Sequence, residues 1–132
     1  MQPKNIPTAP EAIGPYCHAM QVADLVFCSG QTPLDPKTMK IVGTDIRMQT
    51  ERVLQNLTLV LAGVGLDLKH VAKTTVYLKD MADFQGMNEV YSKVFGDHRP
   101  SRTTVAVKQN PLDALVEIEC IAAMDTIPVA DS

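Results

Sequence analysis

Residues 116–122 read VEIECIA, and the alternation within this stretch indicates a β-strand whose two faces differ. Successive side chains of an extended strand point to opposite faces, so the apolar Val116 and Ile118 share one face. Glu117 and Glu119 share the other. Because an ionised glutamate is rarely buried without a partner, these two carboxylates either face solvent or meet a cation from another segment.

The preceding segment, RPSRTTVAV at 99–107, offers such a cation. Its pattern predicts another strand, and the turn residues of QNPLD at 109–113 favour a hairpin that sets the two strands antiparallel. Arg102 then lies within reach of Glu119, directly or through one water. If Glu119 fills the donor fork of the guanidinium, the pair is structural. If the fork is open, it can bind a small carboxylate substrate while Glu119 orients or deprotonates a water.

Upstream, extended and helical patterns alternate. Two short runs, CHAMQVA at 17–23 and LVFCSG at 25–30, predict a tight hairpin, and the β-branched HVAKTTVYLKD at 70–80 predicts a further strand. Apolar residues spaced three and four apart predict two amphipathic helices. The first runs from about Asp45 to Gly63, and the second from Asp83 to Gly96.

The order of elements is strand, strand, helix, strand, helix, strand, strand. It predicts a single α+β domain over 1–132, with a mixed sheet and both helices on one face. The other face carries residues such as Ile121 that also favour burial. An apolar face left in water favours self-association, so we expect a homo-oligomer whose sheets face one another.

Composition narrows the function classes. With 132 residues, 45% hydrophobic, and a net charge of -3, the chain has no general attraction for nucleic acid or anionic lipid. No apolar run has the length of a secretory signal or membrane span, so we expect a cytoplasmic protein. The odd number of cysteines, without a CxxC pair, predicts reduced thiols and no metal site; they are Cys17, Cys28 and Cys120.

Five stretches, taken together and in order, resemble the RidA (YjgF) family of enamine/imine deaminases, from about residue 4 to residue 124. They are APEAIGPY at 9–16, SGQTP at 29–33, KTTVYLKDMADFQGMNEVY at 73–91, RPSRTTVAV and VEIECIA. The resemblance implies a chorismate-mutase-like α+β fold and a homotrimer with sites in clefts between subunits. It also implies hydrolysis of 2-aminoacrylate/2-iminopropanoate and 2-iminobutanoate to 2-keto acids and ammonia, without metal or cofactor.

The resemblance further assigns roles to residues. Arg102 clamps the substrate carboxylate, and Glu119 positions the hydrolytic water. Tyr16 lines the pocket from the neighbouring subunit. The remaining substrate-binding positions that it implies are Ser29, Gly30, Gln31, Asn88 and Thr104.

Several positions depart from the family's frequent residues and bear on the substrate range: Cys17, His18, Met39, Thr104 and Asn110. Two other interpretations of the carboxylate site stay open. One is a regulatory module that binds small carboxylates without turnover. The other is an RNA-directed ribonuclease or translation inhibitor, against which the acidic net charge argues.

The other notable side chains are expected to have structural roles. Tyr77 and Tyr91 fall within the apolar pattern of their elements and are expected in the core or an interface. His70 and His98 are expected at the surface. Gly86, inside the second helix, costs stability without an evident role.

Overall fold

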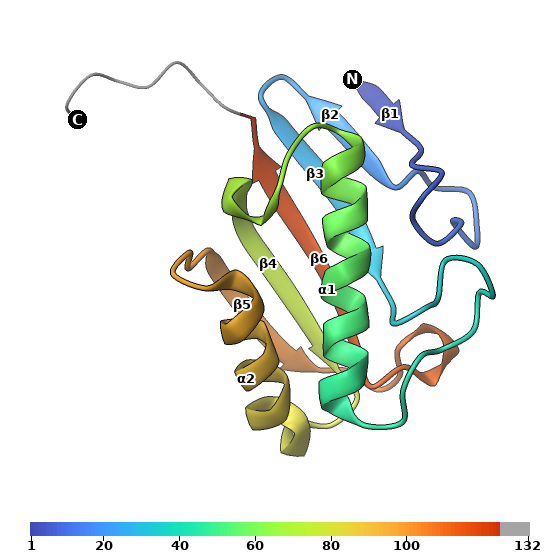
Figure 1. The fold of residues 1–132 in the computed structure, drawn as a ribbon, viewed down its shortest axis with the longest axis vertical. Helices are drawn as coiled ribbons and strands as arrows, with labels where there is room; N and C mark the ends of the chain where they lie inside the picture. The colour runs from blue at the N-terminus through green and yellow to red at the C-terminus, as the bar shows by residue number, and fades with distance from the viewer. Residues whose placement is uncertain (125–132) are drawn as a thin grey trace.

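The computed structural model describes residues 1–124; the end of the expected 1–132 domain, residues 125–132, lies outside the described part. Six strands form one mixed sheet, and two α-helices accompany it (Figure 1). The mixed sheet and both helices were expected, whereas the short first strand at Gln2–Lys4 was not. The strands are β1 (Gln2–Lys4), β2 (Ala19–Val22), β3 (Leu25–Gln31), β4 (Val71–Leu78), β5 (Ser101–Ala106) and β6 (Val116–Ala123). The helices are α1 (Ile46–Gly63) and α2 (Phe84–Phe95). Short 3-10 turns span Leu68–His70, Met81–Asp83 and Pro111–Asp113.

The strand order is β1-β2-β3-β6-β4-β5, which corrects the expected hairpin between β5 and β6. β4 lies between them, parallel to β5 and antiparallel to β6. Parallel neighbours need a crossover connection, which α2 supplies. The connection from β5 to β6 passes the end of β4, where the buried Asn110 amide donates to the carbonyls of Tyr77 and Ala114, both at 3.1 Å.

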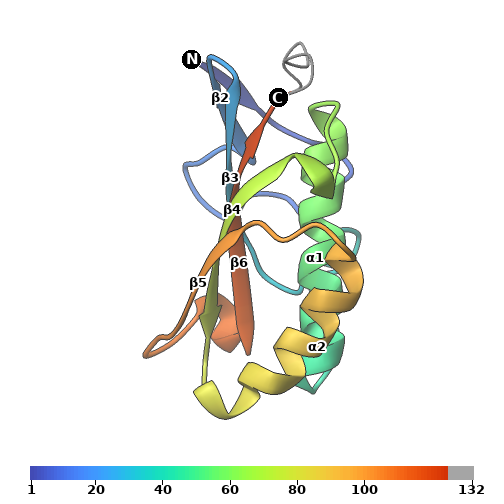
Figure 2. The ribbon, with the colours of Figure 1, turned by 90° about the vertical axis from the view of Figure 1, so that its left-hand side faces the viewer.

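Both helices cover one face of the sheet and leave the other face bare (Figure 2). The expected stripe of α1 is buried against the strands through Val53, Leu54 and Leu57. The sheet contributes the alternate side chains of β6, among them Ile118 and Val116, which are fully buried. The alternation in VEIECIA therefore separates a core face from an open face, as predicted.

The helix ends lie close to the predicted bounds. The Asp45 side chain accepts from the Met48 N–H at 2.9 Å and caps α1, and Gly96 ends α2 with a positive φ of 64°. Asp83 precedes α2 but makes no capping hydrogen bond. None of the helices in the described part is both long and apolar enough to cross a membrane.

Gly86 has a packing role that the sequence did not reveal. A Cβ at this position would lie 2.7 Å from Ile46 Cγ2 of α1. The missing side chain therefore lets the first turns of the two helices approach closely. Arg47 of α1 and Glu89 of α2 add an ion pair on the exposed side of this contact.

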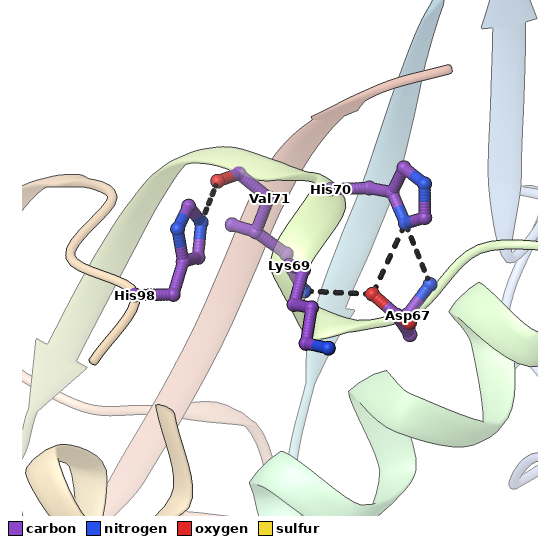
Figure 3. Close-up of polar contacts among 5 residues, drawn as sticks. All are labelled: Asp67, Lys69, His70, Val71 and His98. Atoms are coloured by element: carbon purple, nitrogen blue, oxygen red, sulfur yellow. Dashed lines mark hydrogen bonds and ion pairs between the residues drawn. The ribbon is translucent and has the colours of Figure 1, made fainter. Parts of the chain in front are cut away.

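Two histidines lie near the start of β4 (Figure 3). The half-buried His98 ring bonds through Nε2 to the Val71 carbonyl at 2.7 Å, which ties the chain after α2 to β4. His70 completes a capping box with Asp67, whose carboxylate accepts from the Lys69 N–H at 2.8 Å. His98 is thus more enclosed than the sequence predicted, and it fixes the approach of the chain to β5.

Candidate functional site

Arg102 is the charged residue that lines the first of two cavities in the candidate site. Its register partner on β4 is the buried Thr74, so the Arg102 side chain lies on the helix-covered side of the sheet. The guanidinium carbon stands 4.7 Å from the ring centre of Tyr91 and 5.6 Å from that of Phe84. Stacking on two rings holds the cation in place by a cation–π attraction. Within residues 1–124 no carboxylate pairs with this guanidinium.

A cavity of about 380 Å³ opens beside this cation. Its lining comes from α2 and from the chain leading into β5: Asn88, Tyr91, Ser92, Arg99, Pro100 and Arg102. Two of the site residues expected from the sequence, Asn88 and Arg102, are thus brought together. A cation with polar neighbours and no internal acid suits a small carboxylate.

Tyr91 belongs to this site, although its place in the apolar stripe of α2 predicted only a core or interface residue. Its ring carries the Arg102 guanidinium, and its hydroxyl shares a 2.7 Å hydrogen bond with Thr74 Oγ1. Burial raises the pKa of Tyr91, which opposes the lowering effects of that hydrogen bond and of the nearby arginines. The residue therefore serves as a neutral platform for the cation. This role could not be predicted without knowing which strand faces α2.

Thr104 lies two residues beyond Arg102 and on the same side of β5. Its hydroxyl oxygen is buried without a hydrogen-bond partner in the described part of the chain. Buried hydroxyls are nearly always satisfied in native proteins, so this one is available to a ligand or a neighbouring subunit. It does not line the cavity beside Arg102.

The SGQ element forms a β-bulge at the end of β3. Cys28 pairs with Cys120 and Gln31 pairs with Ile118, so Ser29 and Gly30 together lie opposite Glu119. Ser29 Oγ donates to the Cys17 carbonyl at 2.7 Å, which ties the bulge to the segment that carries Tyr16. Bulges commonly re-aim side chains next to functional sites.

A second cavity, of about 240 Å³, adjoins this bulge. Tyr16, Gly30, Gln31 and Glu117 line it, together with other residues of the N-terminal segment and of the turn before β6. Three of the expected site residues therefore meet here. Glu117, which sequence reasoning left without a role, joins them because its side chain packs against Gly30 of the bulge.

Glu119 lies on the open face of the sheet, where it pairs by register with Thr75 of β4, which in turn pairs with Thr103 of β5. It lines neither cavity. Tyr77 occupies the same face, and its pKa is raised by burial and by the charge of Glu119. Tyr77 is therefore a neighbour of the carboxylates.

The expected contact between Arg102 and Glu119 does not form within one chain. By register, Arg102 aligns with Thr74 and Cys120, whereas Glu119 aligns with Thr75. Residues that are adjacent along a strand point to opposite faces, so the two charges lie on opposite sides of the sheet and β4 runs between their strands. The interpretation as an internal salt bridge is thereby excluded, and the predicted site is divided into two halves.

His18 anchors the N-terminal segment beside the second cavity, the one that Tyr16 lines. Its Nδ1 accepts from the Ile6 N–H and its Nε2 bonds the Pro10 carbonyl, both at 2.7 Å, in a ring only 5% exposed. Because a backbone N–H can only donate and a carbonyl can only accept, the proton resides on Nε2. The imidazole is thus fully engaged and fixes the segment that ends in Tyr16.

Replacing His18 by alanine is expected to lower the free energy of unfolding by about 2 to 4 kcal/mol, since two buried backbone groups lose their partners. His18→Gln offers one acceptor and one donor and should retain most of the stability. Urea denaturation of the three proteins measures this. Equal midpoints for His18→Ala and the wild type would contradict the role assigned to the ring.

Comparison with known proteins places the chain among relatives. The sequence pattern of the family described as endoribonuclease L-PSP matches residues 6–124. The chain belongs to this family, also called RidA or YjgF. A RutC family protein of Pyrococcus abyssi is 49% identical over 86% of this chain and 90% of its own length. A chloroplastic protein of Arabidopsis thaliana named Reactive Intermediate Deaminase A is 46% identical over 88% of this chain and 62% of its own length.

Solved structures of the RidA family share this fold. E. coli TdcF with bound serine superposes with a TM-score of 0.87 at 37% identity, covering 92% of this chain and 99% of that one. The resemblance seen in the sequence is thereby confirmed, as is the expected sheet with two helices. Among the described residues, no group of three or more His, Cys, Asp or Glu gathers closely enough to hold a metal ion.

The departures from frequent RidA-family residues fall in different places. His18 contributes to the wall of the second cavity, whereas Met39 and Asn110 line neither cavity. Met39 takes a positive φ of 58°, a conformation that glycine adopts without strain. Asn110 bonds the connection before β6. Of these three departures, only the one at His18 touches the candidate site.

Proposed function

We propose that the protein is a homotrimeric hydrolase of short 2-imino acids. It converts 2-iminopropanoate, the tautomer of 2-aminoacrylate, and 2-iminobutanoate to 2-keto acids and ammonia. The observation that carries the proposal is the Arg102 guanidinium, held over two rings beside a cavity and without an acid partner among residues 1–124. Support also comes from the name of the plant relative and from the serine, a small carboxylate, bound to TdcF.

The division of the site supports an assembly of several subunits. Arg102, Asn88 and Thr104 lie on the helix side of β4 and β5, and the remaining site residues lie at the β3 bulge, the N-terminal segment and the open face. One chain cannot bring both groups around one small molecule. We propose that each site joins Arg102 of one subunit to Glu119 and Tyr16 of the next.

The open face offers the surface for this contact. Phe27 is paired by register with Met20 and Ile121, and it is 41% exposed; Leu25, paired with Val22, is 40% exposed. Such a contiguous apolar group on a sheet face favours burial against another subunit. Three sheets arranged around one axis would cover it.

In the reaction, Arg102 binds the carboxylate of the imine and Glu119 orients the water that attacks the C=N carbon. Because free imines already hydrolyse in water, positioning and modest proton transfer are sufficient, and a single general acid or base contributes about 10²- to 10⁴-fold. This chemistry uses only the side chains described above.

A coupled assay tests the proposal. A serine/threonine dehydratase generates the imine, and the appearance of keto acid is followed with and without this protein. Acceleration over the spontaneous rate is expected. Binding of pyruvate without acceleration would indicate a carboxylate-sensing module. RNA cleavage or RNA binding at low salt would support the ribonuclease reading, against which the net charge of -3 argues.

A further inference from the structure

The cavity beside Arg102 contains a second cation that the proposed function does not use. Arg99, in the connection between α2 and β5, lines this cavity together with Arg102. Asn88 and Ser92, which line it from α2, are uncharged and lie one helical turn apart. Burial raises the pKa of the Tyr91 hydroxyl at this cavity, and the charges of Arg102 and Arg99 oppose the rise. Two positive charges thus share one small space, and no acidic side chain among residues 1–124 lines it.

The Arg99 side chain is oriented by its own loop. Its Nη1 donates to the carbonyls of Gly96 and His98, the latter at 3.2 Å. The loop is fixed in turn, because His98 bonds the Val71 carbonyl. The donors on Nε and Nη2 make no hydrogen bond or ion pair with a described residue. These two nitrogens form the side of the guanidinium that matches a carboxylate, so a ligand can bind there.

The acidic residues nearby do not neutralise this pair of cations. Glu89 of α2 is paired with Arg47 of α1. Asp97, two residues before Arg99, is exposed and does not line the cavity. Like charges that share a site repel each other, and a ligand with a single carboxylate would leave one of them without a partner. A ligand with two carboxylates would compensate both.

We propose that Arg99 is a specificity-determining residue that binds the second carboxylate of a short 2-imino dicarboxylate, while Arg102 binds the first. The inference rests on the proposed imine hydrolysis and extends its substrate range to acids such as 2-iminosuccinate. In that reaction water adds to the C=N carbon and the C–N bond breaks, which gives oxaloacetate and ammonia. Arg99 binds the ligand and takes no part in the bond changes.

The test compares two imines that differ in the second carboxylate. An L-aspartate oxidase with catalase generates 2-iminosuccinate, the dehydratase generates 2-iminopropanoate, and keto-acid release is followed for each. Wild type should accelerate both reactions. In Arg99→Gln the ratio of kcat/KM for 2-iminosuccinate to kcat/KM for 2-iminopropanoate should fall about 10-fold, because a hydrogen bond between charged groups is lost. Arg99→Lys keeps the charge and should retain most of the wild-type ratio.

Lys93→Gln is the matched control. It removes the same charge from an exposed position of α2 that faces the groove toward α1 and does not line the cavity. The ratio for this variant should equal that of wild type. A fall as large as in Arg99→Gln would show that only the overall charge matters, and it would overturn the inference.

A second readout needs no turnover. Succinate and butanoate have carbon chains of the same length, but only succinate carries a second carboxylate. Calorimetry should show that wild type binds succinate about 10-fold more tightly than butanoate, and that Arg99→Gln loses most of this difference.

The outcomes separate this inference from the proposed function. Equal kcat/KM ratios in wild type and Arg99→Gln would overturn the inference and leave imine hydrolysis standing. If wild type accelerated neither reaction but bound succinate through Arg99, the proposed function would fail and a dicarboxylate sensor would take its place. Absence of both turnover and binding would overturn both proposals.

Discussion

Arg102→Ala is expected to lower kcat/KM for 2-imino acid hydrolysis about 10²- to 10³-fold, the cost of losing one partner of a desolvated charge pair. The substrate carboxylate would enter the cavity beside Asn88 and Tyr91 with only the exposed Arg99 as a cation. The fold should lose little, because the removed interaction is a cation–π contact worth about 0.5 to 1 kcal/mol. The coupled assay and a thermal melt measure the two quantities.

Two further arginine variants separate charge from geometry. Arg102→Lys keeps the charge but not the planar fork and should give an intermediate rate. Arg47→Ala removes an arginine that pairs with Glu89 on the exposed side of the helices, and it should leave the rate unchanged. If Arg102→Ala hydrolysed imines as fast as wild type, the guanidinium would not be the carboxylate clamp.

The elements of the fold could be predicted because their signals are local. The three-and-four spacing in α1, the Asp45 cap and the Gly96 stop each depend on residues within one or two turns. The alternation in β6 likewise identified which of its residues face the core. The core face and the open face of VEIECIA could therefore be assigned before any strand pairing was known.

The pairing of strands could not be predicted in the same way. Segments 101–106 and 116–123 are close in sequence, which favoured a hairpin, yet β4 intervenes because α2 returns the chain parallel to it. Which strand fills the gap is decided by packing between distant segments. This single error placed Arg102 beside Glu119 and hid the division of the site.

The missed site residues have the same origin. Tyr91 reads as a core position, and it becomes a platform only because Arg102 of β5 lies under α2. Glu117 meets the expected site residue Gln31 at a bulge whose extra residue no periodicity shows. Motif resemblance brought Arg102, Asn88 and Gln31 to attention, but it carries no information on which face each one occupies.

Mixing two inactive variants, Arg102→Ala and Glu119→Gln, is expected to restore activity. If each site takes Arg102 from one subunit and Glu119 from its neighbour, random co-assembly of equal amounts gives about a quarter of interfaces with both native residues. Each variant alone should stay far below that rate. The measurement is the coupled assay on the whole mixture after equal amounts of the two proteins are refolded together.

A second mixture makes the result decisive. Wild type co-assembled with the double variant Arg102→Ala/Glu119→Gln should also show about a quarter of full activity, since the two residues must come from adjacent wild-type subunits. A site within one chain would instead give about half in this mixture and nothing beyond background in the first. The former pattern is the one that we expect, because Arg102 and Glu119 occupy opposite faces of the sheet. A substrate that spans less than the thickness of a sheet can touch both only where two subunits meet.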